Sequence, residues 1–339
     1  MQVFAPIKEK LSRKATARNI FRLVNDELEL VEAEYIRQAS SNIQVIDYLG
    51  EYLRASGGKR VRPALLLLAT YAAGGVGSSE NVIRMATVME MLHTATLVHD
   101  DVIDNAEIRR SKASVNARFG DHTAVLMGDW LYMSAFENSL KERSLEILEI
   151  LTRLTRKMTE GELIQLTTVG RVDITEQVYF DILKRKTAYL FSACCEIGAI
   201  LGASDTNVQQ SLREYGMNLG IAFQLADDLL DFTSDDSTIG KAAGADLIDG
   251  KVTLPLIILQ QKDDAARTDL EQVVRDRHYN GVSRHSVVER ANKHGIVEMV
   301  RELAFDYAER ARKNLDVLPE TEYRLALEAI PRYVVDRIN

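Results

Sequence analysis

An all-α fold is predicted for this chain of 339 residues, and three features of its sequence predict it. Its apolar residues are mostly Leu, Ile, Ala and Met, which favour helices. There are only five prolines, and both Pro63 and Pro255 stand near predicted helix starts, where a first turn tolerates proline. No segment alternates apolar and polar residues at period two, as a half-buried strand does. At 339 residues the chain could form one large domain or two, and because 46% of the residues are hydrophobic, a sizeable core is possible.

Helical periodicity gives the order of the predicted elements. The first predicted helix is amphipathic, with apolar residues recurring at helical spacing from Ile20 to Tyr35. A glycine break at 57–58 then precedes the helix that Pro63 opens. The glycine-rich stretch 73–78 lacks the Lys-Ser or Lys-Thr pair of a phosphate-binding loop, and we expect a plain linker there. The other predicted helices cover residues 45–53, 81–104, 121–140, 145–167, 175–201 and 208–232, followed by a candidate lid at 235–250 and smaller helices within 254–337.

Composition excludes several classes of function. The formal net charge of −8 argues against a nucleic-acid partner. The two cysteines, Cys194 and Cys195, are neighbours in an apolar helical run, so they cannot staple the fold. We expect them to be core thiols in a reducing, cytoplasmic compartment. The polar segment Met1 to Lys14 does not read as a signal peptide, and no apolar run of about 18 residues predicts a transmembrane span.

Two short aspartate clusters are the most informative motifs of the chain. They occupy residues 100–104 (Asp-Asp-Val-Ile-Asp) and 227–231 (Asp-Asp-Leu-Leu-Asp), and each ends a long apolar stretch that reads as helix. Residues four apart share a helix face, so Asp100 stands above Asp104, and the second cluster repeats this geometry. The middle aspartate of each cluster is rotated by roughly 100°. Like charges at this spacing destabilise a helix unless something positive binds them.

A solvated acidic face is the common alternative for such a cluster. The neighbouring residues argue against it here, because the strings 96–98 and 221–226 that precede the two clusters are largely apolar. Aspartates in such surroundings need compensating partners. Mg²⁺ prefers hard oxygen ligands and binds one or two carboxylates together with substrate phosphates. The pair of clusters therefore predicts magnesium ions held between facing helices.

Clustered cations near the predicted loops provide the positive half of such a site. The range 57–62 (Gly-Gly-Lys-Arg-Val-Arg) places three cations at a helix start, where backbone donors already favour an anion. The other cations of this kind are Arg109, Arg110, Lys184, Arg185, Lys186, Lys241 and Lys251. Each of them alone is better explained as solvated surface charge. Together they predict a site for two anionic groups, one on magnesium and one on bare cations.

With these motifs taken together, the sequence resembles the trans-isoprenyl diphosphate synthases, or polyprenyl synthetases. The resemblance covers most of residues 40–260. The stretches that carry it stand in the family's order: Gly57–Pro63, Leu97–Asp104 with Arg109-Arg110, Gly128-Asp129, Lys186-Thr187, Phe223–Asp231 and Gly250–Pro255. One departure is Ser111, which stands where the family usually has glycine. Neither arginine before it is lost, so activity is still expected.

The resemblance implies a single domain of long antiparallel helices around a central cavity, working as a homodimer. It also implies that the two aspartate clusters face each other at the cavity mouth. The implied reaction is a prenyl transfer: diphosphate leaves an allylic substrate, isopentenyl diphosphate attacks the resulting carbocation, and a proton is lost to the released diphosphate. The apolar pocket must exclude water from that cation.

The family's functional residues carry over to the matching positions of this chain. The implied metal is Mg²⁺, about three ions per site with diphosphate bound, held mainly by Asp100, Asp104 and Asp227 with Asp101, Asp228 and Asp231 close by. The implied catalytic groups are Asp100, Asp101, Asp104, Asp227, Asp228 and Lys186. The residues implied to hold the allylic diphosphate are Arg109, Lys186, Thr187, Gln224, Lys241 and Lys251. Those implied to hold isopentenyl diphosphate are Lys59, Arg62, His93 and Arg110.

Two histidines on the same predicted helix are interpreted differently. A histidine on a largely apolar helix is most often a core residue. His93, however, lies two turns before Asp100 on roughly the same face, and the resemblance places it in the isopentenyl diphosphate pocket. His99 has no such support and is interpreted as structural.

Small residues one turn before the first aspartate cluster predict a long product. One helical turn is about 5.4 Å, close to the reach of one isoprene unit. Short-chain members of the family often have a bulky aromatic residue there, whereas this chain has Ala95 and Thr96. The string 92–99 is most similar to the long-chain synthases that make quinone side chains. Met133 and Phe136 are the next candidates for the pocket floor.

Three alternatives stay open at this point. A short-chain synthase would release farnesyl or geranylgeranyl diphosphate, and sizing the product separates it from a long-chain enzyme. A non-catalytic subunit of a heteromeric synthase typically loses aspartates or cations, and this chain keeps both sets. A terpene cyclase with the same helical architecture generally lacks a cationic stretch like 57–62.

Overall fold

The computed structural model describes residues 20–55, 57–76, 79–110, 112–234 and 244–338, and over these ranges the chain is all-α, as predicted. The described strands are one short antiparallel pair, β1 (Ile108–Arg109) and β2 (Lys112–Ala113). The chain divides into two compact units. The first comprises Met1–Thr155, Leu190–Arg213 and Leu315–Ala329, and the second comprises Arg156–Tyr189, Glu214–Asn314 and Ile330–Asn339. The single domain expected from the sequence stays a prediction.

The first unit contains the first aspartate cluster and the glycine break. Its elements are η1 (Arg22–Val24), α3 (Asn25–Ala39), α4 (Gln44–Ala55), α5 (Val61–Ala72), α6 (Glu80–Ile103), β1, β2, α7 (Val115–Phe119), α8 (Asp121–Leu140), η3 (Leu315–Val317) and, from Leu190 on, α11 (Tyr189–Leu201). Three helices have residues in both units: α9 (Leu145–Thr168), α12 (Thr206–Thr233) and α19 (Glu322–Val335).

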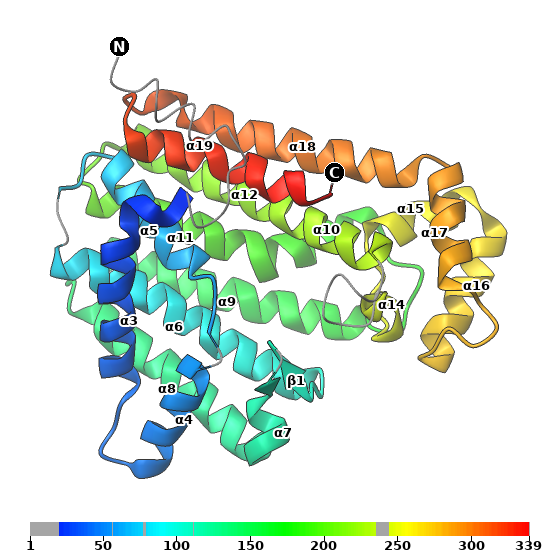
Figure 1. Cartoon of the computed structure of the whole chain (residues 1–339), viewed down its shortest axis with the longest axis horizontal. Helices are drawn as coiled ribbons and strands as arrows, with labels where there is room; N and C mark the ends of the chain where they lie inside the picture. The colour runs from blue at the N-terminus through cyan, green and yellow to red at the C-terminus, as the bar shows by residue number, and fades with distance from the viewer. Residues whose placement is uncertain (1–19, 56, 77–78, 111, 235–243, 339) are drawn as a thin grey trace. The chain divides into compact units, whose positions relative to one another are not determined.

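Helices α6 and α8 lie side by side in the first unit (Figure 1). They are antiparallel, because Arg84 near the start of α6 pairs with Glu142 just after α8. At the other end of α6, His99 lies 3.1 Å from the Val125 carbonyl near the start of α8. Most apolar side chains of α6, such as Met85, are buried. This packing holds the helix that ends in the first aspartate cluster.

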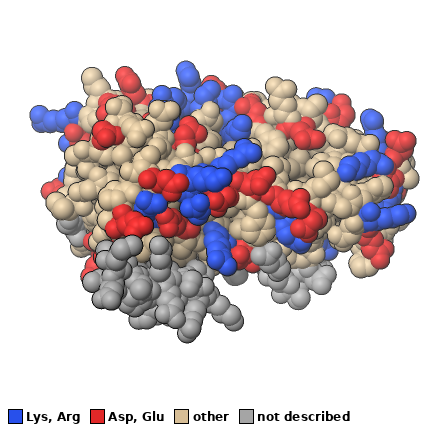
Figure 2. All heavy atoms as spheres, turned by 90° about the horizontal axis from the view of Figure 1, so that it is seen from above, with Lys and Arg blue, Asp and Glu red and all other residues tan. Residues whose placement is uncertain are grey.

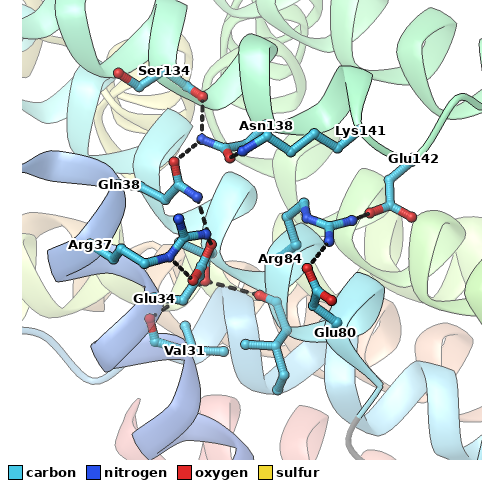
Figure 3. Close-up of polar contacts among 12 residues, drawn as sticks. Val31, Glu34, Arg37, Gln38, Glu80, Arg84, Ser134, Asn138, Lys141 and Glu142 are labelled. Carbon is cyan, nitrogen blue, oxygen red and sulfur yellow. Dashed lines mark hydrogen bonds and ion pairs between the residues drawn. The ribbon is translucent and has the colours of Figure 1, made fainter.

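Polar side chains lock α3 against α6 and α8 (Figure 3). Asn138 of α8 is buried, and its amide donates to the Gln38 side chain of α3. Gln38 in turn donates to Glu34 Oε1 at 2.6 Å. Arg84 of α6 forms its ion pair with Glu142 in the same region. Buried polar groups that have partners specify one arrangement of the helices that carry them, so the register of α6 is well determined.

The second unit contains the second aspartate cluster, which lies on α12. Its other elements are α10 (Glu176–Leu183), the π-helical segment η2 (Lys184–Ala188), α14 (Ala245–Ile248), α15 (Leu254–Lys262), α16 (Asp264–Asp276), α17 (Arg284–Lys293), α18 (Ile296–Asn314) and η4 (Asp336–Ile338). Helices α15, α16, α17 and α18 pack together (Figure 1). Arg290 of α17 joins this group, because its guanidinium donates to Asp263 at 2.8 and 2.7 Å. That contact holds the pKa of Asp263 well below its usual range.

Most predicted helices agree with the structure, and one differs in an informative way. The helix predicted over 121–140 is α8, with the same bounds. The continuous helix predicted over 175–201 is instead α10, a π-helical turn and α11. A π turn inserts one extra residue into the helix, and such turns are frequent at functional sites. The periodicity of the sequence does not signal it, because the apolar pattern continues on both sides.

The distribution of surface charge and the burial of the two cysteines agree with what the composition of the chain predicts. Figure 2 shows one face of the molecule, on which basic and acidic side chains alternate, so no broad basic patch forms there. Cys194 and Cys195 are fully buried, and burial raises the pKa of Cys194 to about 12. Among the helices that the structure describes, none is both long and apolar enough to cross a bilayer.

Candidate active site

The first aspartate cluster is divided between the interior and the surface. Asp101 is buried and accepts both Arg109 Nε hydrogen bonds, at 2.6 and 2.7 Å. Asp104 caps the end of α6 and is exposed, and Asp100 one turn earlier is half-buried. The outer pair therefore faces solvent, whereas the middle carboxylate is occupied by a cation of its own chain. Arg109, predicted to hold the allylic diphosphate, is bound to Asp101 here.

The glycine break at 57–58 is shaped by Arg110. Gly57 has a φ of 67°, in the left-handed region that favours glycine. A Cβ at Gly58 would lie 2.7 Å from Arg110 Nη1, so any other residue would require the Arg110 guanidinium to shift. Arg110 Nη1 also donates to the Gly57 carbonyl. The glycines thus bring an arginine from the β1–β2 turn onto the loop that begins α5.

The residues predicted to hold isopentenyl diphosphate all lie in the first unit: Lys59 and Arg62 at the start of α5, His93 on α6 and Arg110 between β1 and β2. His93 is buried on α6, and burial lowers its pKa well below the usual value. The positive charges of Arg62 and Arg110 lower it further. His93 is therefore neutral at pH 7. The Arg62 guanidinium lies over the Phe191 ring, 5.2 Å from its centroid, and Lys59 is exposed at the loop.

His99 and Gly128 form a tight helix contact between α6 and α8. A Cβ at Gly128 would lie 2.2 Å from His99 Nε2, so the imidazole occupies the space that any other residue would fill. The same nitrogen lies 3.4 Å from Asp129 Oδ1, and the ring stacks on Tyr132 at 5.7 Å between centroids. These contacts agree with the structural interpretation of His99. They also give a physical reason for the glycine of the Gly128-Asp129 motif.

The second aspartate cluster repeats the division found in the first. Asp228 is buried and accepts from Tyr179 Oη at 2.5 Å and from Gln224 Nε2 at 2.8 Å. Burial raises the pKa of Asp228 to about 6. Asp227 is partly exposed and forms an ion pair with Arg337 Nη1 at 2.9 Å. The middle aspartate is again held by its own chain, and an outer aspartate has a cation as its partner.

The π-helical segment η2 places Lys186 and Thr187 beside α12 and α9. The Thr187 hydroxyl donates to Gln224 Oε1 at 2.9 Å, which extends the hydrogen-bond chain that ends at Asp228. Lys186 forms an ion pair with Glu162 of α9. A Cβ at Gly161 would lie 2.6 Å from Arg185 Cβ, so Gly161 permits this close approach of α9.

A cavity of about 230 Å³ lies within the second unit, among these residues. Its polar lining includes Gln165, Thr168, Tyr179, Lys186, Thr187, Gln224, Asp228, Asp246, Lys251 and Thr253. Burial, followed by the charges of Asp231 and Asp228, raises the pKa of Asp246 to about 8. The cavity thus collects most of the groups predicted to hold the allylic diphosphate. Lys241, Ser111 and the part of the candidate lid from 235 to 243 lie outside the described residues.

Several site residues were not predicted from the sequence. Tyr179, Glu162 and Arg337 carry no motif, and they reach the site only through contacts between distant parts of the chain. Asp246 follows a glycine in the candidate lid, but nothing in its neighbours indicates burial. Glu90, which is buried on α6 and pairs with Arg60 beside the glycine break, had a usable signal, since an acid on an otherwise apolar helix needs a compensating partner.

The residues predicted to set product length lie in different surroundings. Ala95 is fully buried, and the half-buried Thr96 donates to the His93 carbonyl at 2.7 Å. Phe136 is half-buried on α8. Met133, however, is 62% exposed, because it lies on the outer face of α8. The structure of one chain therefore does not support Met133 as the floor of a buried pocket.

The aspartates fit Mg²⁺ only in its usual shared mode of binding. Among the described residues, no group of three or more His, Cys, Asp or Glu side chains is arranged to hold a metal ion. Mg²⁺ does not require such a cage, because it keeps several waters and takes one or two carboxylates together with substrate phosphates. The outer aspartates, four residues apart on a helix face, fit this mode.

Comparisons with known proteins agree on one family. The family model described as Polyprenyl synthetase matches residues 43–290. Octaprenyl diphosphate synthase of Escherichia coli is 38% identical over 321 residues, covering 94% of this chain and 98% of that protein. The all-trans-nonaprenyl-diphosphate synthase (geranyl-diphosphate specific) of Rhodobacter capsulatus is 38% identical, covering 88% of this chain and 91% of the relative. A polyprenyl synthase of Caulobacter crescentus, solved with calcium and isoprenyl diphosphate, has a TM-score of 0.88 at 35% identity, covering 94% of this chain and 97% of that one.

Proposed function

Because the chain belongs to the polyprenyl synthetase family, we propose that it is an all-trans long-chain polyprenyl diphosphate synthase. It adds isopentenyl diphosphate stepwise to an allylic diphosphate primer. The observation that carries this proposal is the common division of the two aspartate clusters. In each, the middle carboxylate is buried and bound within the chain, the outer carboxylates are exposed or half-buried, and cations that suit diphosphate lie nearby; one outer carboxylate, Asp227, pairs with Arg337.

The outer aspartates Asp100, Asp104, Asp227 and Asp231 are the proposed ligands of Mg²⁺, which, when bound, stabilises the negative charge of the departing diphosphate. Asp101 and Asp228 support them by fixing Arg109, Tyr179 and Gln224 around each cluster. This refines the expectation from the sequence, in which Asp100, Asp104 and Asp227 were the main ligands and the other three aspartates stood close by. A buried carboxylate that already accepts two hydrogen bonds has less capacity left for an ion.

Each of the two groups of polar and cationic residues is proposed to bind the diphosphate of one substrate. Lys59, Arg62, His93 and Arg110 are proposed to hold the diphosphate of isopentenyl diphosphate, and the neutral imidazole of His93 contributes a hydrogen bond rather than a charge. Lys186, Thr187, Gln224, Lys241 and Lys251 are proposed to hold the allylic diphosphate. Support for this comes from the cavity of the second unit, which four of these five residues line. Arg109 joins them only if it is released from Asp101.

The proposed product is long, and its quinone side-chain use remains part of the proposal. Ala95 and Thr96 are small residues one turn before Asp100, so neither side chain blocks a growing apolar chain at that level. The cysteines, buried and unbridged, agree with a reducing compartment such as the cytoplasm.

We propose that a second copy of the chain covers α8. Leu126, Met133 and Leu140 are 68%, 62% and 58% exposed, and their spacing of two helical turns places them along one face of this helix. Large exposed apolar side chains that share one face of a helix are characteristic of protein interfaces. Light scattering should find a dimer in the wild type and a monomer in Met133→Glu. A wild-type monomer at micromolar concentration would contradict this part of the proposal.

Product analysis tests the proposed function. The purified protein is incubated with Mg²⁺, isopentenyl diphosphate and several allylic primers, and the products are sized by mass spectrometry. We expect all-trans chains of about seven to ten isoprene units, given an open turn at Ala95. Release of chains of three or four units would favour the short-chain alternative. The absence of any condensation would overturn the proposal.

A further inference from the structure

Arg60 differs from the cations that flank it in the sequence. Lys59 is exposed, whereas the Arg60 side chain is only 16% exposed. The backbone of Arg60 has a φ of 49°, in the left-handed region, at the N-cap of α5. A residue with a Cβ rarely adopts this conformation and keeps it only where its surroundings over-determine it. The contacts that fix the Arg60 side chain therefore also fix the turn that orients Lys59 and the start of α5.

Two carboxylates from different helices hold the Arg60 guanidinium. Nη1 donates to Glu90 Oε1 of α6 at 2.6 Å, and Nη2 and Nε donate to Glu32 Oε2 of α3 at 2.7 and 3.0 Å. The guanidinium also lies over the Tyr35 ring, 5.4 Å from its centroid. The Glu90 side chain is 4% exposed. Charge-assisted hydrogen bonds of this number and burial fix a side chain in one geometry.

This group, the Arg60 clamp (Arg60, Glu32 and Glu90), adjoins the proposed isopentenyl diphosphate site. Arg60 stands between Lys59 and Arg62, and Glu90 lies one turn before His93 on α6. The clamp thus ties the cationic loop to the same helix that carries the buried histidine. We propose that Glu32 and Glu90 act through Arg60 as positioning residues for isopentenyl diphosphate, and that Arg60 itself is not a ligand. This inference rests on the proposed function.

The two possible roles of Arg60 predict opposite effects of removing a glutamate charge. If Arg60 touched the diphosphate, Glu90→Gln would free its positive charge and strengthen the attraction for the anion. If the clamp positions the loop, the same change loosens the left-handed turn, displaces Lys59 and Arg62, and weakens binding. Glutamine keeps the size and one acceptor of glutamate, so the variant changes charge more than packing.

Steady-state kinetics of Glu90→Gln with each substrate varied in turn tests the clamp. We expect the KM for isopentenyl diphosphate to rise about tenfold, while kcat and the KM for the allylic primer change less than about twofold. Calorimetric titration with isopentenyl diphosphate alone should show the same loss of affinity without turnover. If the KM of Glu90→Gln for isopentenyl diphosphate is unchanged or lower, the proposed role of the clamp is overturned. An equal rise of the KM values for both substrates overturns it too.

Glu142→Gln is the matched control, since it breaks the Arg84–Glu142 pair of the same unit, whose two side chains are similarly buried at 13% and 7% exposure. It should leave both KM values unchanged, and a rise equal to that of Glu90→Gln overturns the proposal. If circular dichroism shows that Glu90→Gln does not fold, Glu32→Gln replaces it as the test of the clamp, because the Glu32 side chain is 35% exposed and its loss disturbs the core less. The KM of Glu32→Gln for isopentenyl diphosphate should rise about threefold. If the wild type binds isopentenyl diphosphate but does not condense it, the proposed function is overturned. The calorimetric titration of Glu90→Gln with isopentenyl diphosphate still tests the clamp in that case.

Discussion

Replacing Arg337 with glutamine is expected to strengthen Mg²⁺ binding at the second aspartate cluster. Arg337 Nη1 lies 2.9 Å from Asp227 Oδ1, so the guanidinium occupies an oxygen that the proposed metal ion needs. Two unit charges at this distance attract by about 1.4 kcal/mol in water. The two side chains are 33% and 35% exposed, and measured exposed pairs give roughly 0.2–1 kcal/mol. Removing the competitor should therefore lower the apparent Kd for Mg²⁺ by up to about fivefold.

The assay is calorimetric titration of Mg²⁺ into the full-length protein without substrate, supported by the Mg²⁺ dependence of Tm. Arg332→Gln is the control, because it also removes one positive charge from the C-terminal segment but breaks only the exposed 3.6 Å pair with Asp336. The control should bind Mg²⁺ as the wild type does. Unchanged or weaker Mg²⁺ binding by Arg337→Gln would refute the competition between Arg337 and Mg²⁺ at Asp227. If both variants bound Mg²⁺ more tightly by the same factor, the change in net charge would explain the effect, and competition at Asp227 would again be refuted.

Three other predictions follow from the burial of single residues. Asp100→Asn should lower kcat at least about 100-fold and leave Tm unchanged. Asp101→Asn should instead lower Tm, because Arg109 loses the buried carboxylate that it pairs with. Steady-state kinetics and thermal melts of both variants distinguish the two effects. Ala95→Phe should shorten the product to about three or four isoprene units by mass spectrometry and destabilise the fold by about 1–3 kcal/mol, since the site is fully buried. Asp246 has a folded pKa of about 8 against an ordinary 3.8, so the wild type binds more protons when folded and loses stability as the pH rises from 4 to 8. In EDTA, Asp246→Asn should lack this loss, and a Tm difference that is constant across this range would contradict the buried carboxyl.

The helices and the positions of the two aspartate clusters follow from the sequence alone. Apolar periodicity predicted α8 with its observed bounds, because that signal is local and depends only on the turn of the helix. The spacing of four residues likewise placed Asp100 and Asp104 on one face. The glycines at 57 and 58 predicted a break, although the reason for the second one, the Arg110 guanidinium against its Cα, appears only in the structure.

The partners of the charged side chains were decided by tertiary structure. Nothing in the sequence distinguishes Arg60 from Lys59 and Arg62, yet Arg60 is bound to glutamates of α3 and α6 while Lys59 is exposed. The middle aspartate of the second cluster meets Tyr179, which lies 49 residues away, and an outer one meets Arg337, 110 residues away. Periodicity specifies which face of a helix is buried, whereas the identity of the facing side chain depends on how separate helices pack. Sequence therefore predicted where charge gathers, and only packing decided which charges are neutralised within the chain and which remain accessible to metal and diphosphate.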